Sequence, residues 1–155
     1  MNRDNQEFKL EYSYWIEKMH ASFWGRVDTA NNIALIILGC AVVATWEINE
    51  IIGLLVAIIS AINVVIQPVK KSMIAKEQAF KFSRIITQLD TMSDAELCER
   101  MEAIADNNCD VVGMIEPLAF NRAAIVLDLV PTQKYSLLNK LAGHFIGDLP
   151  DNKND

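Results

Sequence analysis

The chain has 155 residues with 14 basic and 20 acidic side chains, and 52% of its residues are apolar. This apolar content excludes a disordered chain, and three cysteines exclude a disulfide-stapled scaffold. A net charge of −6 disfavours nucleic acid as a partner. A mean hydropathy of +0.17 is high for so charged a chain. The apolar residues must therefore be concentrated, and they are, between residues 30 and 66.

Residues 1–28 predict an amphipathic N-terminal helix. Asp4 is suited to cap it, since Glu7 follows three residues later as in a capping box. Large apolar side chains then recur at spacings of three and four residues: Phe8, Tyr12, Trp15, Met19 and Phe23. This spacing places them on one face, which is typical of a packing surface, although such a face also suits the surface of a membrane.

Residues 29–69 predict a transmembrane hairpin, because two segments within them, about 29–46 and 51–69, carry no charged side chain. Helices of this length span roughly 27–28 Å at about 1.5 Å per residue, which is adequate for a thin bilayer. The alternative is a hairpin buried in the core of a soluble protein. The rest of the chain is too polar to supply such a core, so a hairpin in the lipid bilayer is favoured.

The flanks of the two spans predict their orientation. The connecting loop contains Glu47 and Glu50 and no basic residue, whereas basic residues cluster beyond the outer ends of both spans: Lys18, Arg26, Lys70, Lys71, Lys76, Lys81 and Arg84. The positive-inside rule then places both termini in the cytoplasm. Trp24 and Trp46 lie 22 residues apart and are expected to anchor the first span at the two interfaces.

Residues 70–155 are predicted to form a cytoplasmic tail of helices, so the fold class is all-α. Pro68 is the expected hinge between the second span and this tail, because proline ends or kinks a helix. A basic amphipathic helix is expected at about 72–89, with these apolar positions: Ile74, Phe80, Ile85 and Leu89. Three more helices are expected: one from a capping box at 93–96 to about 105, one opening at Glu116-Pro117, and one from Thr132 to about Phe145.

The sequence contains no motif that indicates catalysis. Cys40 lies within the first span, and Cys98 and Cys109 are eleven residues apart with no histidine near them. Structural zinc sites need four clustered ligands, and His20 and His144 are isolated. Phosphate-binding loops, nucleophile elbows and zinc-protease motifs do not occur in the sequence. A non-enzymatic protein without metal or cofactor is therefore predicted.

One face of the second span is small or polar. At 100° per residue this face comprises Gly53, Ala57, Ser60, Asn63 and Gln67, whereas the opposite face is bulky and aliphatic. Lipid tails do not select for such a split, but a close helix neighbour or a water-filled cavity does. Two interpretations stay open: the face packs helices together, or it lines a pore between copies. In both cases a homo-oligomer is expected.

The order of parts resembles a known family. A helix with the pair Tyr14-Trp15 and a following His20 leads into a two-span hairpin with an acidic turn, and a basic helix and a helical tail follow. Over roughly residues 8–130 this arrangement resembles the SLATT domain, a two-helix membrane effector domain associated with bacterial nucleotide-signalling and conflict systems. The resemblance implies a pore-forming effector of the bacterial inner membrane, triggered during phage attack by a sensor protein or a nucleotide second messenger.

Three functions fit the sequence. The first is an oligomeric pore-forming effector that depolarises the inner membrane. The second is a non-enzymatic membrane anchor or adaptor, which would use the helical tail to hold a cytoplasmic partner. The third is a holin-like lysis protein, whose short spans match but which needs a shorter tail. An adaptor should leave the membrane potential intact, and timed lysis distinguishes a holin from an effector.

Overall fold

The computed structural model describes residues 3–44, 49–105 and 111–151. Its elements are α1 (Arg3–Ala44), α2 (Asn49–Ile66), α3 (Pro68–Gln88), the 3₁₀ turn η1 (Leu89–Thr91), α4 (Asp94–Ala105), α5 (Glu116–Val126) and α6 (Leu137–Ile146). In these ranges every regular element is helical and no strand occurs. The all-α prediction is thereby confirmed.

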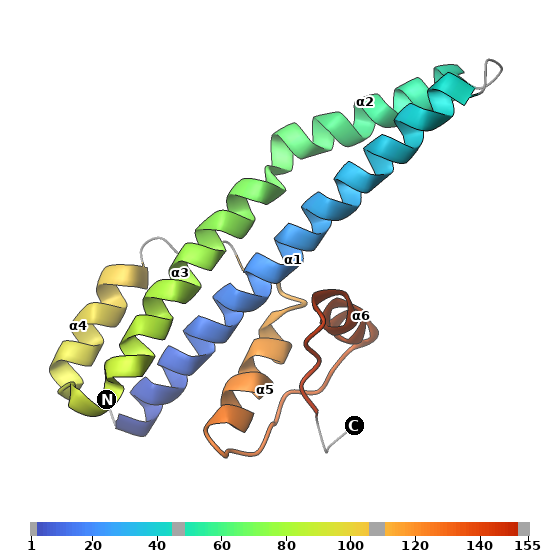
Figure 1. Ribbon diagram of the computed structural model, residues 1–155. Coiled ribbons are helices and arrows are strands. Elements are labelled where there is room, and N and C mark those ends of the chain that lie inside the picture. Colours follow the sequence, from blue (N-terminus) through green and yellow to red (C-terminus); the bar gives the residue numbers. More distant parts are fainter. Residues whose placement is uncertain (1–2, 45–48, 106–110, 152–155) are drawn as a thin grey trace.

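The helix α1 is the axis of the molecule. Its 42 residues contain no proline and extend about 63 Å at 1.5 Å per residue. The amphipathic segment and the first apolar segment are thus one helix, with no break at residue 28. In Figure 1, α2 runs back along the C-terminal half of α1 and α3 along its N-terminal half. The C-terminal half of α1 and the whole of α2 form a projecting arm, and α3 to α6 surround the N-terminal half of α1.

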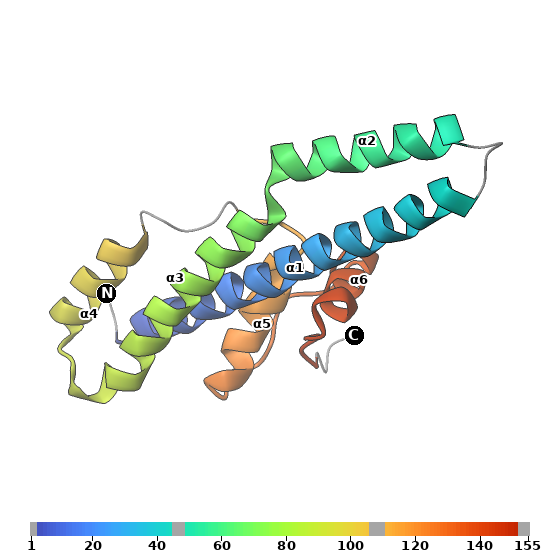
Figure 2. The same cartoon turned by 45° about the horizontal axis from the view of Figure 1, so that its top comes forward.

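The chain breaks between α2 and α3 at a single residue. Gln67 adopts the left-handed conformation, with φ 51° and ψ 56°, and Pro68 occupies the first turn of α3. Proline suits this position because its φ is already helical and it has no N–H to leave unpaired. The predicted break at Pro68 is confirmed, but the next helix begins there and not at about Ser72. Figure 2 shows the two helices offset at this point.

One core cluster fixes α5 and α6 to α1. Its buried members are Ile16, Met19, Ile115, Leu118, Ala119, Ala142 and Ile146. The aromatic face of α1 packs on this cluster, and Phe23 lies edge-on to Phe145 with 5.6 Å between the ring centroids. Phe8 meets Phe120 in the same way at 4.9 Å. The aromatic spacing in the sequence therefore marks a packing surface.

A second cluster lies on another side of α1, against α3 and α4. Its buried members are Leu10, Phe82, Ile85, Met92, Leu97 and Met101. The predicted apolar positions Ile74 and Phe80 are wrong as core positions, because Phe80 is 58% exposed and Ile74 is 37% exposed. Ala75 and Ala79 are buried in their place, and their small side chains let α3 approach α1 closely.

The predicted start of α4 is confirmed, whereas the predicted start of α6 is wrong. At α4, the Ser93 hydroxyl accepts from the Glu96 backbone N–H at 3.3 Å, as predicted. The start of the last helix at Thr132 is wrong, because α6 begins at Leu137. Ser136 caps it, with its hydroxyl accepting from the Asn139 N–H at 3.2 Å.

The segment before α6 is extended because a buried side chain satisfies its backbone. The amide nitrogen of Asn121 donates to the Gln133 carbonyl at 2.7 Å, and the amide oxygen of Asn121 accepts from the Gln133 N–H at 3.0 Å. Asn121 is fully buried. A helix through residue 133 would need those backbone groups for its own ladder.

One helical stretch is long and apolar enough to cross a membrane, by length and composition, among the residues that the structure describes. This stretch is Glu50–Thr91, and only 6% of its most apolar 18 residues are buried. The apolar half of α1 beside it is also uncovered, with Ile33, Ile36 and Ile37 exposed.

Candidate functional site

The two helices of the arm contact each other along one seam, and their outer sides are exposed. The half-buried residues of α2 recur every three or four positions: Ile52, Val56, Ile59, Ser60, Asn63 and Ile66. Those of α1 opposite them do the same: Asn31, Ala34, Leu35, Leu38 and Ala41. The remaining aliphatic side chains of α2, including Leu54, Ile58 and Val65, are exposed. The arm therefore has a packed seam and a large uncovered apolar surface.

Asn63 pairs with an amide on α1. The side-chain nitrogen of Asn31 donates to the side-chain oxygen of Asn63 at 2.6 Å. Both residues are half-buried in the seam. An amide in an apolar environment is costly unless it is hydrogen-bonded, so this pair stabilises the seam at the end nearer α3. Asn31 was not among the predicted site residues, although it and Asn63 lie almost equally far from the hairpin turn and must face each other.

The small-residue face of α2 is divided between two surroundings. Ser60 and Asn63 turn partly toward α1, whereas Gly53 and Ala57 are exposed. A Cβ atom added at Gly53 would meet no described atom within 4 Å. The seam with α1 therefore does not use Gly53 or Ala57, and these residues are open to another helix.

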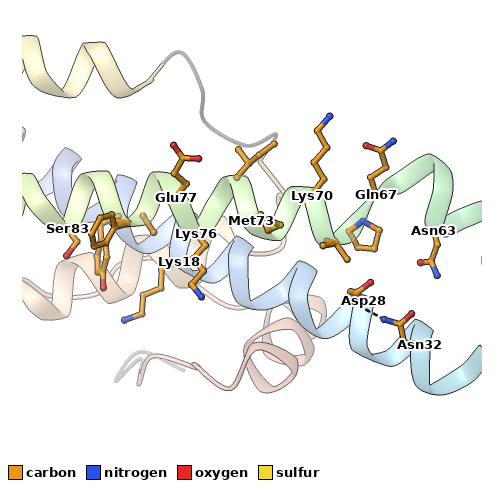
Figure 3. A pocket seen from close by; sticks show the side chains of 16 residues that line it. Lys18, Asp28, Asn32, Asn63, Gln67, Lys70, Met73, Lys76, Glu77 and Ser83 are labelled. Carbon is orange, nitrogen blue, oxygen red and sulfur yellow. Dashed lines mark hydrogen bonds between the residues drawn. The ribbon is translucent and has the colours of Figure 1, made fainter. Parts of the chain in front are cut away.

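A groove of about 1220 Å³ opens where α2 gives way to α3 (Figure 3). It brings together three of the predicted residues: Asn63, Gln67 and Pro68. Its end nearer α2, on the right in Figure 3, is rich in amides, and lysines from two helices, Lys18 and Lys76, lie farther along it. Apolar side chains of α3 complete the lining. Two carboxylates, Asp28 and Glu77, also line the groove, so basic, acidic and apolar side chains lie side by side in it.

Trp24, one of the two predicted anchors, lies half-buried at the base of the arm. The ammonium group of Lys71 is 4.6 Å from the centroid of its ring. One turn away, the Ser72 hydroxyl donates to the Ala21 carbonyl at 2.8 Å. This close approach of α3 and α1 passes over Gly25, where a Cβ would come within 3.2 Å of the Ser72 oxygen. Trp46, the other predicted anchor, lies outside the described residues.

His20 is a buried structural residue. Its Nε2 atom accepts a hydrogen bond from the Val112 backbone N–H at 3.1 Å, and its side chain is fully buried. Burial lowers the pKa of His20 to about 4, so the ring is neutral at pH 7. The Nδ1 atom meets no hydrogen-bond partner in the described part of the chain. The sequence pattern around His20 did not predict this contact.

The cysteines lie in different surroundings. Cys40 is exposed on the arm, and Cys98 donates a hydrogen bond to the Glu102 carboxylate, which raises the pKa of its thiol. Cys109 lies outside the described residues. Over residues 3–44, 49–105 and 111–151, no group of three or more His, Cys, Asp or Glu side chains is placed to hold a metal ion. Comparisons with protein-family models, curated proteins and solved structures found no match.

Proposed function

We propose that this protein is a pore-forming membrane effector. The arm of α1 and α2 inserts into the bacterial inner membrane with both termini in the cytoplasm, and copies assemble through α2. A partner protein or a nucleotide signal triggers the assembly, which then depolarises the membrane. The observation that carries the proposal is the uncovered apolar surface of α2, which includes the open positions Gly53 and Ala57.

Insertion of the arm is supported by its surface. Exposed aliphatic side chains cover both helices of the arm. Full transfer of each such side chain from water to an apolar environment is favourable by roughly 1.5–3 kcal/mol. Glu50 lies at the tip of α2, while Arg26 and Lys70 lie at the base of the arm. This distribution of charge favours a cytoplasmic base under the positive-inside rule.

Assembly through α2 is supported by its two open small residues. Transmembrane helices associate where small side chains let their backbones approach, since lipid solvates large aliphatic side chains equally well on every side. Gly53 and Ala57 face away from α1 and are one turn apart. A second copy of α2 can therefore lie close to them without disturbing the hairpin.

In the proposal, the Asn31–Asn63 hydrogen bond belongs to the closed state. Each amide satisfies the other within the seam, so neither is offered to a pore. Opening exchanges this bond for water or for the same residue of other copies. Gln67, in its left-handed conformation, and Pro68 follow Asn63 by about one turn. They supply the hinge through which the cytoplasmic helices act. The adjoining groove, which three lysines and two carboxylates line, gives a trigger a polar place to bind beside this hinge.

The test is membrane potential in bacteria that express the full chain, followed with a voltage-sensitive dye. Added to the Asn31→Leu variant, Asn63→Leu should abolish depolarisation and leave insertion and oligomer size unchanged. Asn31→Leu should depolarise without the trigger, because it releases Asn63. The matched control is Asn32→Leu: Asn32 is the next amide on α1, and it bonds Asp28 at 3.1 Å and not Asn63. Full activity of the variant with Asn63→Leu would contradict a pore-lining role of Asn63 and leave helix packing as the role of the small or polar face of α2.

A membrane anchor or adaptor is the second candidate. The observation that favours it is the same hydrogen bond, because a pair of amides that satisfy each other inside the hairpin needs no pore to explain it. For an adaptor, expression of the wild type and of all three variants leaves the potential intact. A holin-like protein would instead cause lysis at a fixed time after induction.

A further inference from the structure

The free side of α6 is apolar. One face of this helix packs in the first core cluster through Ala142 and Ile146. On another side Leu137 is 82% exposed, Leu141 is 65% exposed, and Leu138 and Phe145 are also exposed. We call Leu137, Leu138, Leu141 and Phe145 the leucine face. A helix on the surface of a soluble bundle normally turns polar residues outward, so this face requires an explanation.

The position of α6 supplies one. The helix lies across α1 at the base of the arm, where Figures 1 and 2 show it beside the middle of the long helix. Phe23 packs on Phe145, and the Arg26 guanidinium donates to the Phe145 carbonyl. Both α1 residues come just before the uncharged segment that begins at Thr29. The helix α6 therefore lies at the depth where α1 would enter a bilayer.

The contacts of α6 also settle which way the leucine face points. Ala142 and Ile146 share a core cluster with Ile16 and Met19, which lie farther from the arm, whereas Phe145 meets Phe23, which lies nearer to it. Passing around α6 from Ile146 to Phe145 thus moves along α1 toward the arm. At 100° per residue the leucines continue in the same direction. The leucine face therefore extends from the side of α6 nearer the arm, where Phe145 lies, to the side turned away from α1.

Other residues at this depth have the chemistry of a membrane interface. Trp24 follows Phe23 on α1 and carries the ammonium group of Lys71 over its ring. Lys70 is exposed beside Lys71. Indole rings and basic side chains gather at the headgroup level of membranes, where one end of each side chain is apolar and the other is wet. The leucine face and these residues together form one level around α1.

We infer that α6 is an interfacial helix whose leucine face lies in the cytoplasmic leaflet, at the boundary between headgroups and acyl chains. The inference rests on the proposed insertion of the arm and adds a second membrane contact to it. Amphipathic helices bind in this way by burying their apolar face while they lie in the plane of the membrane. Because α6 also packs on α1, this contact holds the cytoplasmic helices against the bilayer beside the arm.

The experiment uses the full chain with its three cysteines replaced by alanine, reconstituted in vesicles of phosphatidylcholine and phosphatidylglycerol. Single cysteines carry an environment-sensitive fluorophore, and lipids carry nitroxide quenchers at a shallow or a deep position. Leu141→Cys reports on the leucine face and Ile58→Cys on the exposed side of α2. Glu99→Cys, on the exposed side of α4, is the aqueous control.

The expected result is strong quenching at residue 141, greater with the shallow nitroxide than with the deep one, and weak quenching at residue 99. Replacing Leu137 and Leu138 by Gln should reduce quenching at residue 141 by roughly twofold or more, since half of the leucine face is then polar. Both side chains are exposed, so an unchanged circular dichroism spectrum should accompany the loss.

The residue 58 probe separates the two proposals. Quenching at residue 58 without quenching at residue 141 overturns the interfacial role of α6 and leaves insertion of the arm standing. A blue-shifted fluorophore at residue 141 that lipid nitroxides do not quench also overturns it, because a second protein copy then covers the leucine face. No quenching at residue 58 overturns insertion of the arm, and the inference about α6 with it.

Discussion

His20 connects two parts of the chain that are 92 residues apart. Its ring fills a fully buried position on α1 and accepts the N–H of Val112, the second described residue after α4. This acceptor must be the unprotonated Nε2 atom, so the hydrogen bond requires a neutral ring. Sequence spacing gives no sign of it, because the partner is a backbone group in a segment without periodicity.

At the residue scale, we predict that stability falls as the pH is lowered from 6.5 to 4. The pKa of His20 is about 4 when folded and about 6.5 when unfolded, so in this window the unfolded chain binds the extra proton. The stabilisation is complete above pH 6.5, and its loss approaches roughly 3 kcal/mol near pH 4. Thermal unfolding of the detergent-solubilised chain between pH 7.5 and 5 measures the slope.

His20→Gln isolates this effect from the carboxylates. The glutamine amide oxygen can still accept from Val112, but the side chain does not titrate in this range, so the pH dependence should flatten. His144→Gln changes an exposed histidine and should leave the slope of the wild type. Equal slopes for the wild type and His20→Gln would show that the ring is not the titrating group.

At the element scale, local signals predicted where helices start and stop better than which faces they bury. Pro68, the capping box at Ser93 and the pair Glu116-Pro117 act through their own backbone chemistry, and each marks a helix start in the structure. The predicted helix start at Thr132 was wrong because the side chain of Asn121, eleven residues earlier, binds the backbone of the next residue, Gln133. Tertiary contacts of that kind leave no periodic pattern in a sequence.

The burial of α3 could not be predicted for a related reason. Large apolar side chains suggested a packing face that includes Phe80, but the helix sits so close to α1 that small residues such as Ala75 and Ala79 face the contact. Phe80 is left on the surface, where the Arg84 guanidinium lies 4.7 Å from its ring centroid. The candidate site was only partly predictable for the same reason. Asn63 could be found from its helix face, but its partner Asn31 could be found only from the pairing of the two helices.

Two phenylalanines on α3 therefore give a matched test. Phe82 is 1% exposed in the second core cluster, so Phe82→Ala should destabilise the protein by about 3–5 kcal/mol. Phe80→Ala removes the same atoms from an exposed position and should cost about 1 kcal/mol or less. Urea denaturation of the two variants in detergent measures both values, and similar losses for both would contradict the register of α3.

At the scale of the whole molecule, the chain consists of a helical bundle built on half of α1 and an arm that the same helix continues. The bundle has two buried clusters, whereas the arm has a single seam and an apolar exterior. Movement of the bundle is transmitted to α1 without a break, whereas along the chain it reaches α2 through the break at Gln67 and Pro68. The two helices of the arm are thus coupled unequally to the bundle, and a trigger that acts on the bundle would slide or tilt one past the other.

An oligomer of such molecules has to use the outer surface of the arm, and two glycines offer a matched test of which part it uses. Gly53 on α2 and Gly39 on α1 are both exposed, and an added Cβ at either meets no described atom within 4 Å. Leucine at either position fits the single chain, so neither change should disturb the hairpin. Gly53→Leu should nevertheless reduce oligomer size in detergent, because it blocks the close approach of a second α2, while Gly39→Leu should leave it unchanged. Size-exclusion chromatography with light scattering measures both, and equal oligomers in the two variants would rule out Gly53 as the contact.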